Sequence, residues 1–238
     1  MNSRPAARHR PPNKGLKLTS RLAALARAQR GTVWYSAGPA RPERRPAAYA
    51  LSVGRTRGEK PAMMASVFVG TSVDGFIARP DGGLDFLPPG GGEPHGYDEF
   101  MATVDVIVIG RKTFETVLTF DAWPYGDKRV VVLSSRPVDL SAAAVRGGVV
   151  EQMGGPPEEI VSRLAATGAR HLYVDGGSTI QGFLRAGLVQ RLIITRVPVL
   201  IGDGIPLFGT LQRDIRLRHV ATQHYPSGLV KSEYAVAA

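Results

Sequence analysis

Residues 106–115 read VIVIGRKTFE, and this stretch predicts the fold of the domain around it. The four branched aliphatic residues at 106–109 predict a strand that is buried on both faces, as strands of parallel sheets are. Gly110 ends the strand, and an amphipathic helix follows at once. Between them stand two cations and a hydroxyl, namely Arg111, Lys112 and Thr113. A buried strand that ends on a glycine and two cations indicates that the start of the helix receives an anion.

The same alternation continues from Met63 to the end of the chain. Apolar runs predict further strands at 64–70, 129–133, 147–152, 171–175 and 189–200. Amphipathic runs predict helices at 97–104, 111–118, 156–168 and 178–188. Residues 215–236 predict a hairpin that turns at Pro226, Ser227 and Gly228. Alternating strands and helices with a terminal hairpin predict an α/β domain with a mostly parallel sheet and one antiparallel edge.

The positive charge of the chain is confined to its first quarter. The formal net charge is +10, but residues 1–62 hold 14 Lys and Arg against two Glu, which gives +12. Residues 63–238 hold 16 Lys and Arg against 18 acidic residues, which gives −2. The sequence therefore predicts a basic extension rich in Pro, Ala and Arg over 1–62 and one folded domain over 63–238.

Four interpretations of residues 1–62 stay open. They form a disordered extension, an artefact of a translation start placed upstream of Met63 or Met64, an organellar transit peptide, or a nucleic-acid-binding arm. The near-neutral domain gives no reason to expect nucleic acid as its partner. No run is long and apolar enough to span a membrane, so we expect a cytoplasmic protein that does not associate with membranes.

Cysteine and histidine usage limits the chemistry. The absence of cysteine excludes disulfides, thiolate metal sites and cysteine nucleophiles. The five histidines, at positions 9, 95, 171, 219 and 224, lack metal-ligand spacing. We therefore expect no metal site.

Three predicted strand ends carry groups that suit phosphate. The first is Gly110 to Thr113, where Thr113 can cap the helix or donate its hydroxyl. The second follows the strand at 129–133 and consists of Ser134, Ser135 and Arg136. The third follows the strand at 171–175 and consists of Gly176, Gly177, Ser178 and Thr179. In parallel sheets such ends share one edge, where ligands collect.

Each loop alone is an ordinary turn or cap, but together they favour a ligand with several anionic groups. NADPH has the right number, since it carries a pyrophosphate and a separate 2′-phosphate. The sequence contains neither G-x-G-x-x-G after a strand nor G-x-x-x-x-G-K-[ST], so the common dinucleotide and P-loop motifs are absent.

Five segments occur in the order found in dihydrofolate-reductase-like proteins. They are SVFVGTSVDGFIA (66–78), DVIVIGRKTFE (105–115), RVVVLSSRP (129–137), LYVDGGSTIQGFL (172–184) and GLVQRLIITRVPVLIGDGIPLF (187–208). Over roughly residues 64–236, the chain resembles more closely the reductase domain of the bacterial riboflavin-biosynthesis deaminase-reductase and its stand-alone relatives. This resemblance implies a dihydrofolate-reductase-like three-layer α/β fold, NADPH as cofactor and a homodimer.

The resemblance also implies roles for the three loops. Residues Gly110 to Thr113 would hold the cofactor's phosphates, and Gly176 to Thr179 would form the pyrophosphate turn. Ser134, Ser135 and Arg136 would bind the adenosine 2′-phosphate, which favours NADPH over NADH. Gly70 and Ile77 would border the nicotinamide.

The substrate half departs from the family pattern. The riboflavin reductases have a lysine where this chain has Phe76, and their Asp-Asp-Pro-x-Leu-x-x-Arg segment is replaced here by TFDAWPYGDK (119–128). The acid that dihydrofolate reductases carry on the helix before VIVIG has no clear counterpart, although Asp98 and Glu99 lie nearby. Trp123 and Tyr125 could cover a ligand, although packing within a surface loop is the simpler interpretation.

Two acids are candidates for catalysis. Asp175 ends a buried strand directly before the glycine turn, which predicts a position between nicotinamide and substrate. Asp74 would lie across the same cleft, although a turn-forming Asp-Gly is the simpler interpretation. We expect an NADPH-dependent reductase of a small heterocyclic or ribosylamino substrate. The alternatives are a dihydrofolate- or pterin-type reductase and a nucleotide-binding module without catalysis.

Overall fold

The computed structural model describes residues 63–88 and 95–237, so the expectations for residues 1–62 lie outside the described part. The strands are β1 (Met64–Thr71), β2 (Phe76–Ala78), β3 (Val106–Gly110), β4 (Arg129–Leu133), β5 (Val149–Met153), β6 (His171–Asp175), β7 (Arg191–Arg196), β8 (Ile205–Pro206), β9 (Leu217–His224) and β10 (Val230–Val236). The helices are α2 (Tyr97–Ala102), α3 (Arg111–Val117), α4 (Ser141–Val145), α5 (Pro157–Ala166) and α6 (Gly177–Arg185).

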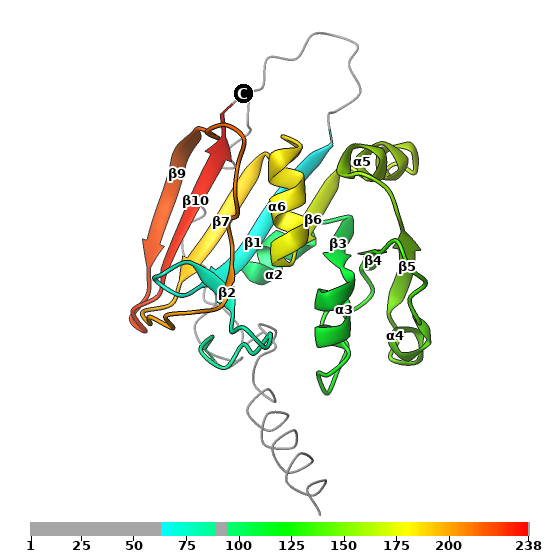
Figure 1. The fold of residues 1–238 in the computed structure, drawn as a ribbon, viewed down its shortest axis with the longest axis horizontal. Helices are drawn as coiled ribbons and strands as arrows, with labels where there is room; N and C mark the ends of the chain where they lie inside the picture. Colours follow the sequence, from blue (N-terminus) through cyan, green and yellow to red (C-terminus); the bar gives the residue numbers. More distant parts are fainter. Residues whose placement is uncertain (1–62, 89–94, 238) are drawn as a thin grey trace, which may run out of the picture.

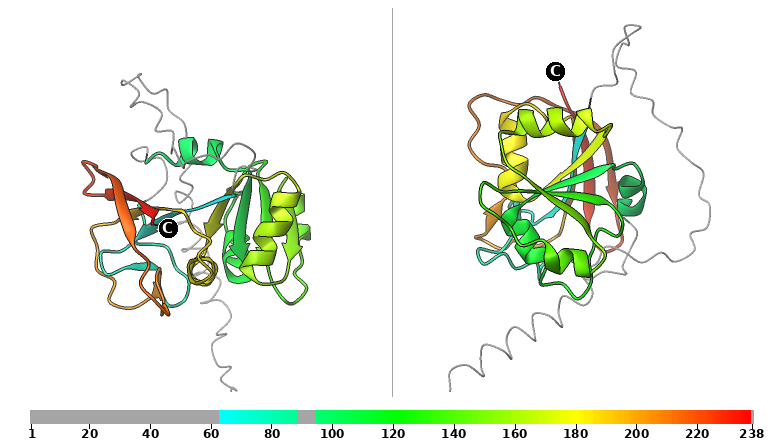
Figure 2. Two further views of the ribbon diagram at one scale, coloured as in Figure 1. Left: turned by 90° about the horizontal axis from the view of Figure 1, so that it is seen from above. Right: turned by 90° about the vertical axis from the view of Figure 1, so that its right-hand side faces the viewer.

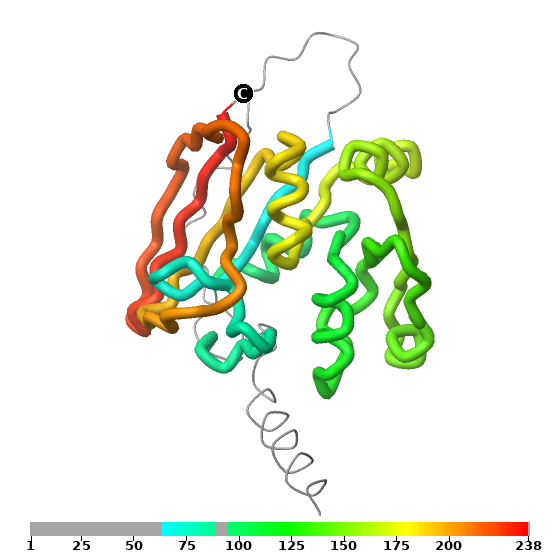
Figure 3. The backbone as a smooth tube through the Cα atoms, viewed as in Figure 1, coloured from blue at the N-terminus to red at the C-terminus, as the bar shows by residue number. Residues whose placement is uncertain are grey.

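Eight of these strands form one sheet in the order β5-β4-β3-β6-β1-β7-β10-β9 (Figure 1). The six strands from β5 to β7 are parallel, and β10 and β9 add an antiparallel hairpin at the edge. The backbone trace in Figure 3 shows this hairpin at the opposite side of the molecule from β5 and α4. The predicted parallel sheet with its antiparallel edge is therefore confirmed.

Alternate residues of the central strands pack into two separate cores, which makes the fold three-layered. Val106 and Val108 of β3 join the core that α5 and α6 cover. Ile107 and Ile109 of the same strand join the core that α2, α3 and α4 cover. Figure 2 shows helices on both sides of the sheet. All four side chains are fully or almost fully buried, which explains why this strand reads as one apolar run.

Three short elements were not predicted. The pair β2–β8 forms a separate two-stranded antiparallel sheet, and α4 is a single five-residue helix. Elements this short are too small to show a hydrophobic period. The strands predicted at 147–152 and 189–200 are also narrower than expected, since β5 covers Val149–Met153 and β7 covers Arg191–Arg196. Within the described residues, none of the helices is long and apolar enough to cross a bilayer.

Candidate active site

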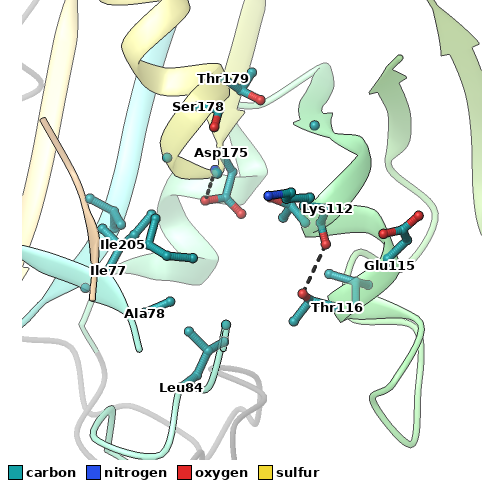
Figure 4. Close-up of a pocket in the computed structure, with 18 of the residues that line it drawn as sticks. Ile77, Ala78, Leu84, Lys112, Glu115, Thr116, Asp175, Ser178, Thr179 and Ile205 are labelled. Atoms are coloured by element: carbon teal, nitrogen blue, oxygen red, sulfur yellow. Dashed lines mark hydrogen bonds between the residues drawn. The ribbon is translucent and has the colours of Figure 1, made fainter. Parts of the chain in front are cut away.

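A wide cavity opens at the carboxyl ends of β1, β3, β6 and β7. It has a volume of about 1060 Å³, at the upper end of the range for small-molecule sites. Most of the predicted cofactor residues line it, namely Gly70, Ile77, Gly110, Arg111, Lys112, Thr113, Gly176, Gly177, Ser178 and Thr179. Asp175 also lines it. Figure 4 shows Asp175 and Lys112 on opposite sides of the opening between α6 and α3.

The turns after β3 and β6 pack closely against each other. These strands are neighbours, with Ile109 of β3 opposite Asp175 of β6. A Cβ atom at Gly110 would lie 2.8 Å from Oγ1 of Thr179, and one at Gly176 would overlap Oγ1 of Thr113. Each turn reads G-x-x-T, and the threonine of each turn occupies the space above the glycine of the other. Both glycines are thus required by close packing, and Gly176 also by its φ of 90°.

Both helices that begin at these turns have free N-termini facing the cavity. The N-cap residues are Gly110 for α3 and Gly176 for α6, and neither helix has a side-chain cap. Of the two roles considered for Thr113, a helix cap is not observed, because its hydroxyl packs against Gly176 instead; donation of the hydroxyl to a ligand stays a prediction. Uncapped first-turn amides from two adjacent helices present several donors to one anion. The side chain of Lys112 adds a positive charge, while Arg111 is held by Glu115 at 2.7 Å.

Ile77 and Gly70 lie on the sheet side of the same cavity. A Cβ atom at Gly177 would lie 3.1 Å from Cδ1 of Ile77 and 3.2 Å from Cγ2 of Ile205. The β2–β8 pair therefore packs closely on the start of α6. Gly70 lies on β1 opposite Thr195 of β7, and both residues line the cavity.

The Ser134 to Arg136 loop lies one strand further out. It follows β4, whose last residue, Leu133, lines the cavity, but the three loop residues do not. The Ser134 hydroxyl donates to the carbonyl of Arg136 and accepts from its amide, so this serine shapes the turn. Ser135 and Arg136 are exposed. The loop is thus available to an anionic group that extends beyond the main cavity.

Asp175 has an unusual environment for an acid. Its carboxyl is partly exposed to the cavity and is otherwise surrounded by protein, and it accepts a hydrogen bond of 2.7 Å from the Gly176 amide. Burial raises the pKa of Asp175 to about 6, and the single hydrogen bond opposes this only in part. No ion pair within the described residues involves this side chain. Asp175 can therefore exchange a proton near neutral pH.

Asp74 does not lie in the cavity, and this expectation requires correction. Its carboxylate accepts hydrogen bonds from the amides of Ile201 at 3.2 Å and Gly202 at 2.7 Å. These bonds, together with one from the side chain of Ser72, lower the pKa of Asp74. The residue ties the β1–β2 turn to the loop before β8, as a turn-forming acid does.

Of the aromatic wall of the cavity, the sequence suggested only Tyr125, as one of two interpretations of that residue. Phe68, Tyr97, Tyr125 and Tyr173 all line it. Tyr125 is buried rather than part of an exposed loop, and desolvation raises its pKa well above the usual value, with the charge of Asp175 as a second cause. Helix α2 turns Tyr97 inward and leaves Asp98 and Glu99 exposed, so neither acid reaches the cavity.

The cavity holds one more polar group that the sequence did not reveal. Thr195 lies on β7, is 1% exposed and lines the cavity. Its Oγ1 is buried and has no hydrogen-bond partner in the part of the chain that the structure describes. Such groups are rare in folded proteins because an unpaired buried hydroxyl costs free energy. Among the described residues, no cluster of three or more His, Asp or Glu side chains could hold a metal ion.

A family model, described as the RibD C-terminal domain, matches residues 65–231. The chain belongs to the RibD C-terminal domain family. The chain is 30% identical over 165 residues to the uncharacterized protein YwjB of Bacillus subtilis, and the match covers 67% of this chain and 90% of YwjB. It is also 36% identical to the crystal structure of a putative riboflavin biosynthesis protein from Shewanella sp. PV-4, with a TM-score of 0.67 over 74% of this chain and all of that one.

The fold is also similar to that of dihydrofolate reductase. The enzyme from Enterococcus faecalis, in a structure of its complex with NADP(H) and RAB-propyl, is 18% identical to this chain. It has a TM-score of 0.50, with 75% of this chain and 98% of that enzyme covered. The predicted dihydrofolate-reductase-like fold and the resemblance to riboflavin-biosynthesis reductases are therefore confirmed.

The close packing of the two turns predicts that removing a threonine hydroxyl restores the stability lost when a glycine is replaced by alanine. We expect Gly110→Ala to lower the free energy of unfolding by about 1–2 kcal/mol, because the new methyl meets the Thr179 hydroxyl. In a Thr179→Ala background the same change should cost less than about 0.5 kcal/mol, since no other atom lies within contact distance. Thr113→Ala should rescue Gly176→Ala only in part, because it removes the overlap with the hydroxyl but leaves the unfavourable positive φ. Urea unfolding of the six variants and the wild type measures these costs, and an equal cost of Gly110→Ala with and without Thr179→Ala would contradict the close packing of the two turns.

The raised pKa of Asp175 predicts a stability change without any ligand. The carboxyl titrates near 6 in the folded protein and near 3.8 in the unfolded chain, so the folded state holds the extra proton between these values. Its contribution to stability is complete below about pH 4 and is lost as the pH rises through about 6. Asp175→Asn should therefore raise the free energy of unfolding by about 1–2 kcal/mol at about pH 8 and leave it unchanged below about pH 4. If Asp175→Asn were less stable than the wild type at alkaline pH, the Asp175 carboxylate would be well solvated or paired in the folded protein.

Proposed function

We propose that this protein is an NADPH-dependent reductase that acts on a small heterocyclic or ribosylamino acceptor. Its family is riboflavin-biosynthesis reductase-like, and its fold is shared with dihydrofolate reductase. The observation that carries the proposal is the convergence of two uncapped helix N-termini, from α3 and α6, on one cavity with Lys112. This arrangement suits the pyrophosphate of a dinucleotide.

The residues present fit such a cofactor. The first-turn amides of α3 and α6 would hold the pyrophosphate, and the glycines at 110, 176 and 177 permit the close approach of backbone to ligand. Ser135 and Arg136, exposed beyond Leu133, would hold the adenosine 2′-phosphate. Gly70 and Ile77 would face the nicotinamide.

When bound, NADPH supplies a hydride, so that two electrons reach the carbon of a C=N or C=O bond while one proton is added to the heteroatom. The protein orients the acceptor and supplies that proton. We assign the proton to the Asp175 carboxyl, which lines the cavity and has a pKa close to neutrality. The aromatic wall and the buried position keep water from the reacting atoms.

Oxidation of NADPH with a panel of pterin, folate and ribosylaminopyrimidine acceptors tests this function. We expect turnover with at least one of them. If the protein binds NADPH but none of the acceptors leads to its oxidation, the protein is a nucleotide-binding module instead.

The role of Asp175 predicts a pH profile. The protonated carboxyl is the active form, so kcat/KM should be constant below about pH 6 and fall about tenfold per pH unit above it. Asp175→Asn should lower turnover at least about tenfold and remove this limb, while NADPH affinity changes by less than about twofold. A variant with the wild-type profile would exclude Asp175 as the proton donor.

We expect Arg136 to determine the preference for NADPH over NADH. We expect Arg136→Gln to reduce the preference for NADPH over NADH at least about tenfold, because a charge-assisted bond to the 2′-phosphate is lost. NADH affinity should not change. Arg185→Gln, at the far end of α6, is the matched control. Calorimetric titration with both cofactors measures the ratio of their affinities. An unchanged ratio would show that the 2′-phosphate does not bind at Arg136.

We also propose that the protein is a homodimer. All eight residues of the edge strand β9 are exposed, including Leu217 at 42% and Val220 at 38%. A second copy that covers this strand would protect its free edge and these apolar side chains. Light scattering of the purified protein determines the mass directly.

A further inference from the structure

The residues that line the cavity restrict the class of acceptor that the proposed reductase can bind. We propose that the acceptor is an unphosphorylated, planar heterocycle that donates N–H hydrogen bonds to Asp175 and bonds to the hydroxyl of Thr195. This inference rests on the proposed function and specifies its substrate class.

The first argument is the distribution of charge. Of the described residues that line the cavity, only Arg111 and Lys112 are cationic, and both stand in the first turn of α3. Arg111 is already bound to Glu115, and both cations lie beside the amides assigned to the cofactor. A phosphate on the acceptor would enter this cavity without a cation of its own, at a large desolvation cost.

Cations close to the cavity are engaged elsewhere. Arg79, which follows Ala78 in the chain, forms two hydrogen bonds with Asp85, of 2.6 and 2.9 Å. Lys231, whose backbone lies opposite Thr195, donates to the carbonyl of His95 at 2.9 Å. The described part of the chain therefore shows no built site for a second phosphate.

The second argument is that two polar anchors lie on one face of the sheet. Side chains alternate between faces along a strand. Tyr173 of β6, Phe68 of β1 and Ile193 of β7 all join the core on the α2–α3 side. Two residues further along each strand come Asp175, Gly70 and Thr195, which therefore face the same side and line the cavity.

Strand β1 lies between the two anchors, and its register places Gly70 beside Thr195 and Phe68 two residues earlier, at the level of Asp175, so no side chain fills the space next to Thr195. The two intervening strand spacings and this two-residue offset place the backbones of the anchors roughly 12 Å apart, and their side chains shorten the gap. One planar heterocycle with its ring substituents spans this distance. The aromatic side chains of Phe68, Tyr97 and Tyr125 offer surfaces for packing against it.

The chemistry of the anchors sets the ligand's hydrogen-bonding groups. Within the described residues, the Asp175 carboxyl forms no ion pair and accepts one hydrogen bond, from the Gly176 amide, which leaves acceptor positions open toward the cavity. Amino and ring N–H groups of a pyrimidine or pteridine complement it. The Thr195 hydroxyl, buried without a partner, would gain its missing bond from a ring carbonyl or amino group.

Calorimetry on the protein saturated with NADP⁺ tests the assignment with two sets of probes. The first is 5-amino-6-ribosylaminouracil and its 5′-phosphate, which differ only in the phosphate. We expect the unphosphorylated compound to bind at least about tenfold more tightly. Equal or tighter binding of the phosphate ester would overturn the proposal.

The second probe is 2,4-diaminopteridine, measured on variants of the two anchors. Asp175→Asn should weaken its binding at least about tenfold, and Thr195→Val about three- to tenfold, with recovery in Thr195→Ser. Thr71→Val, a buried threonine on the opposite face of β1, should have no effect. NADP⁺ affinity should stay within about twofold in all variants, and thermal unfolding confirms that each is folded.

Failure of the substrate assignment is distinguishable from failure of the reductase. Unchanged pteridine affinity in Asp175→Asn, or no pteridine binding by a protein that binds NADP⁺, would refute the assignment and leave the reductase intact. A wild-type protein that does not bind NADP⁺ would refute the reductase itself, and the substrate class with it.

Discussion

The site depends on the contact between two turns that are far apart in the sequence. Gly110 and Gly176 each receive the threonine hydroxyl of the other turn, so neither strand end can move without displacing the other. The helices that start there are consequently held with their N-termini close together. Two short helices thus act as one donor surface, whereas a single seven-residue helix such as α3 would present few amides.

Local sequence patterns predicted the elements but not their pairing. Continuous apolar runs such as 106–109 and 171–175 identify buried strands, and the glycine turns identify the sheet edge where a ligand would bind. That β3 pairs with β6 depends on the path of the chain, because β4 and β5 lie between them in sequence. The repeated G-x-x-T spacing is visible in the sequence, but its meaning follows only from this pairing.

The residues that sequence reasoning missed or left open share a physical cause. Thr195 stands in an apolar strand, where its hydroxyl looks like any β-branched position until its burial and lack of a partner are known. Tyr125 lies in a segment without periodicity, and only tertiary packing buries it. Asp74 shows the opposite error, since an acid in a turn near the site serves the backbone of residues 201 and 202 rather than a ligand. The cavity is thus divided between a polar half built from helix ends and an aromatic half beside Asp175.

A crystal structure of the protein with NADP⁺ tests this account most directly. The pyrophosphate oxygens should lie about 3 Å from first-turn amides of both α3 and α6, with the adenosine 2′-phosphate near Arg136. A complex in which the dinucleotide contacts only one of the two helices, or binds outside this cavity, would contradict the account.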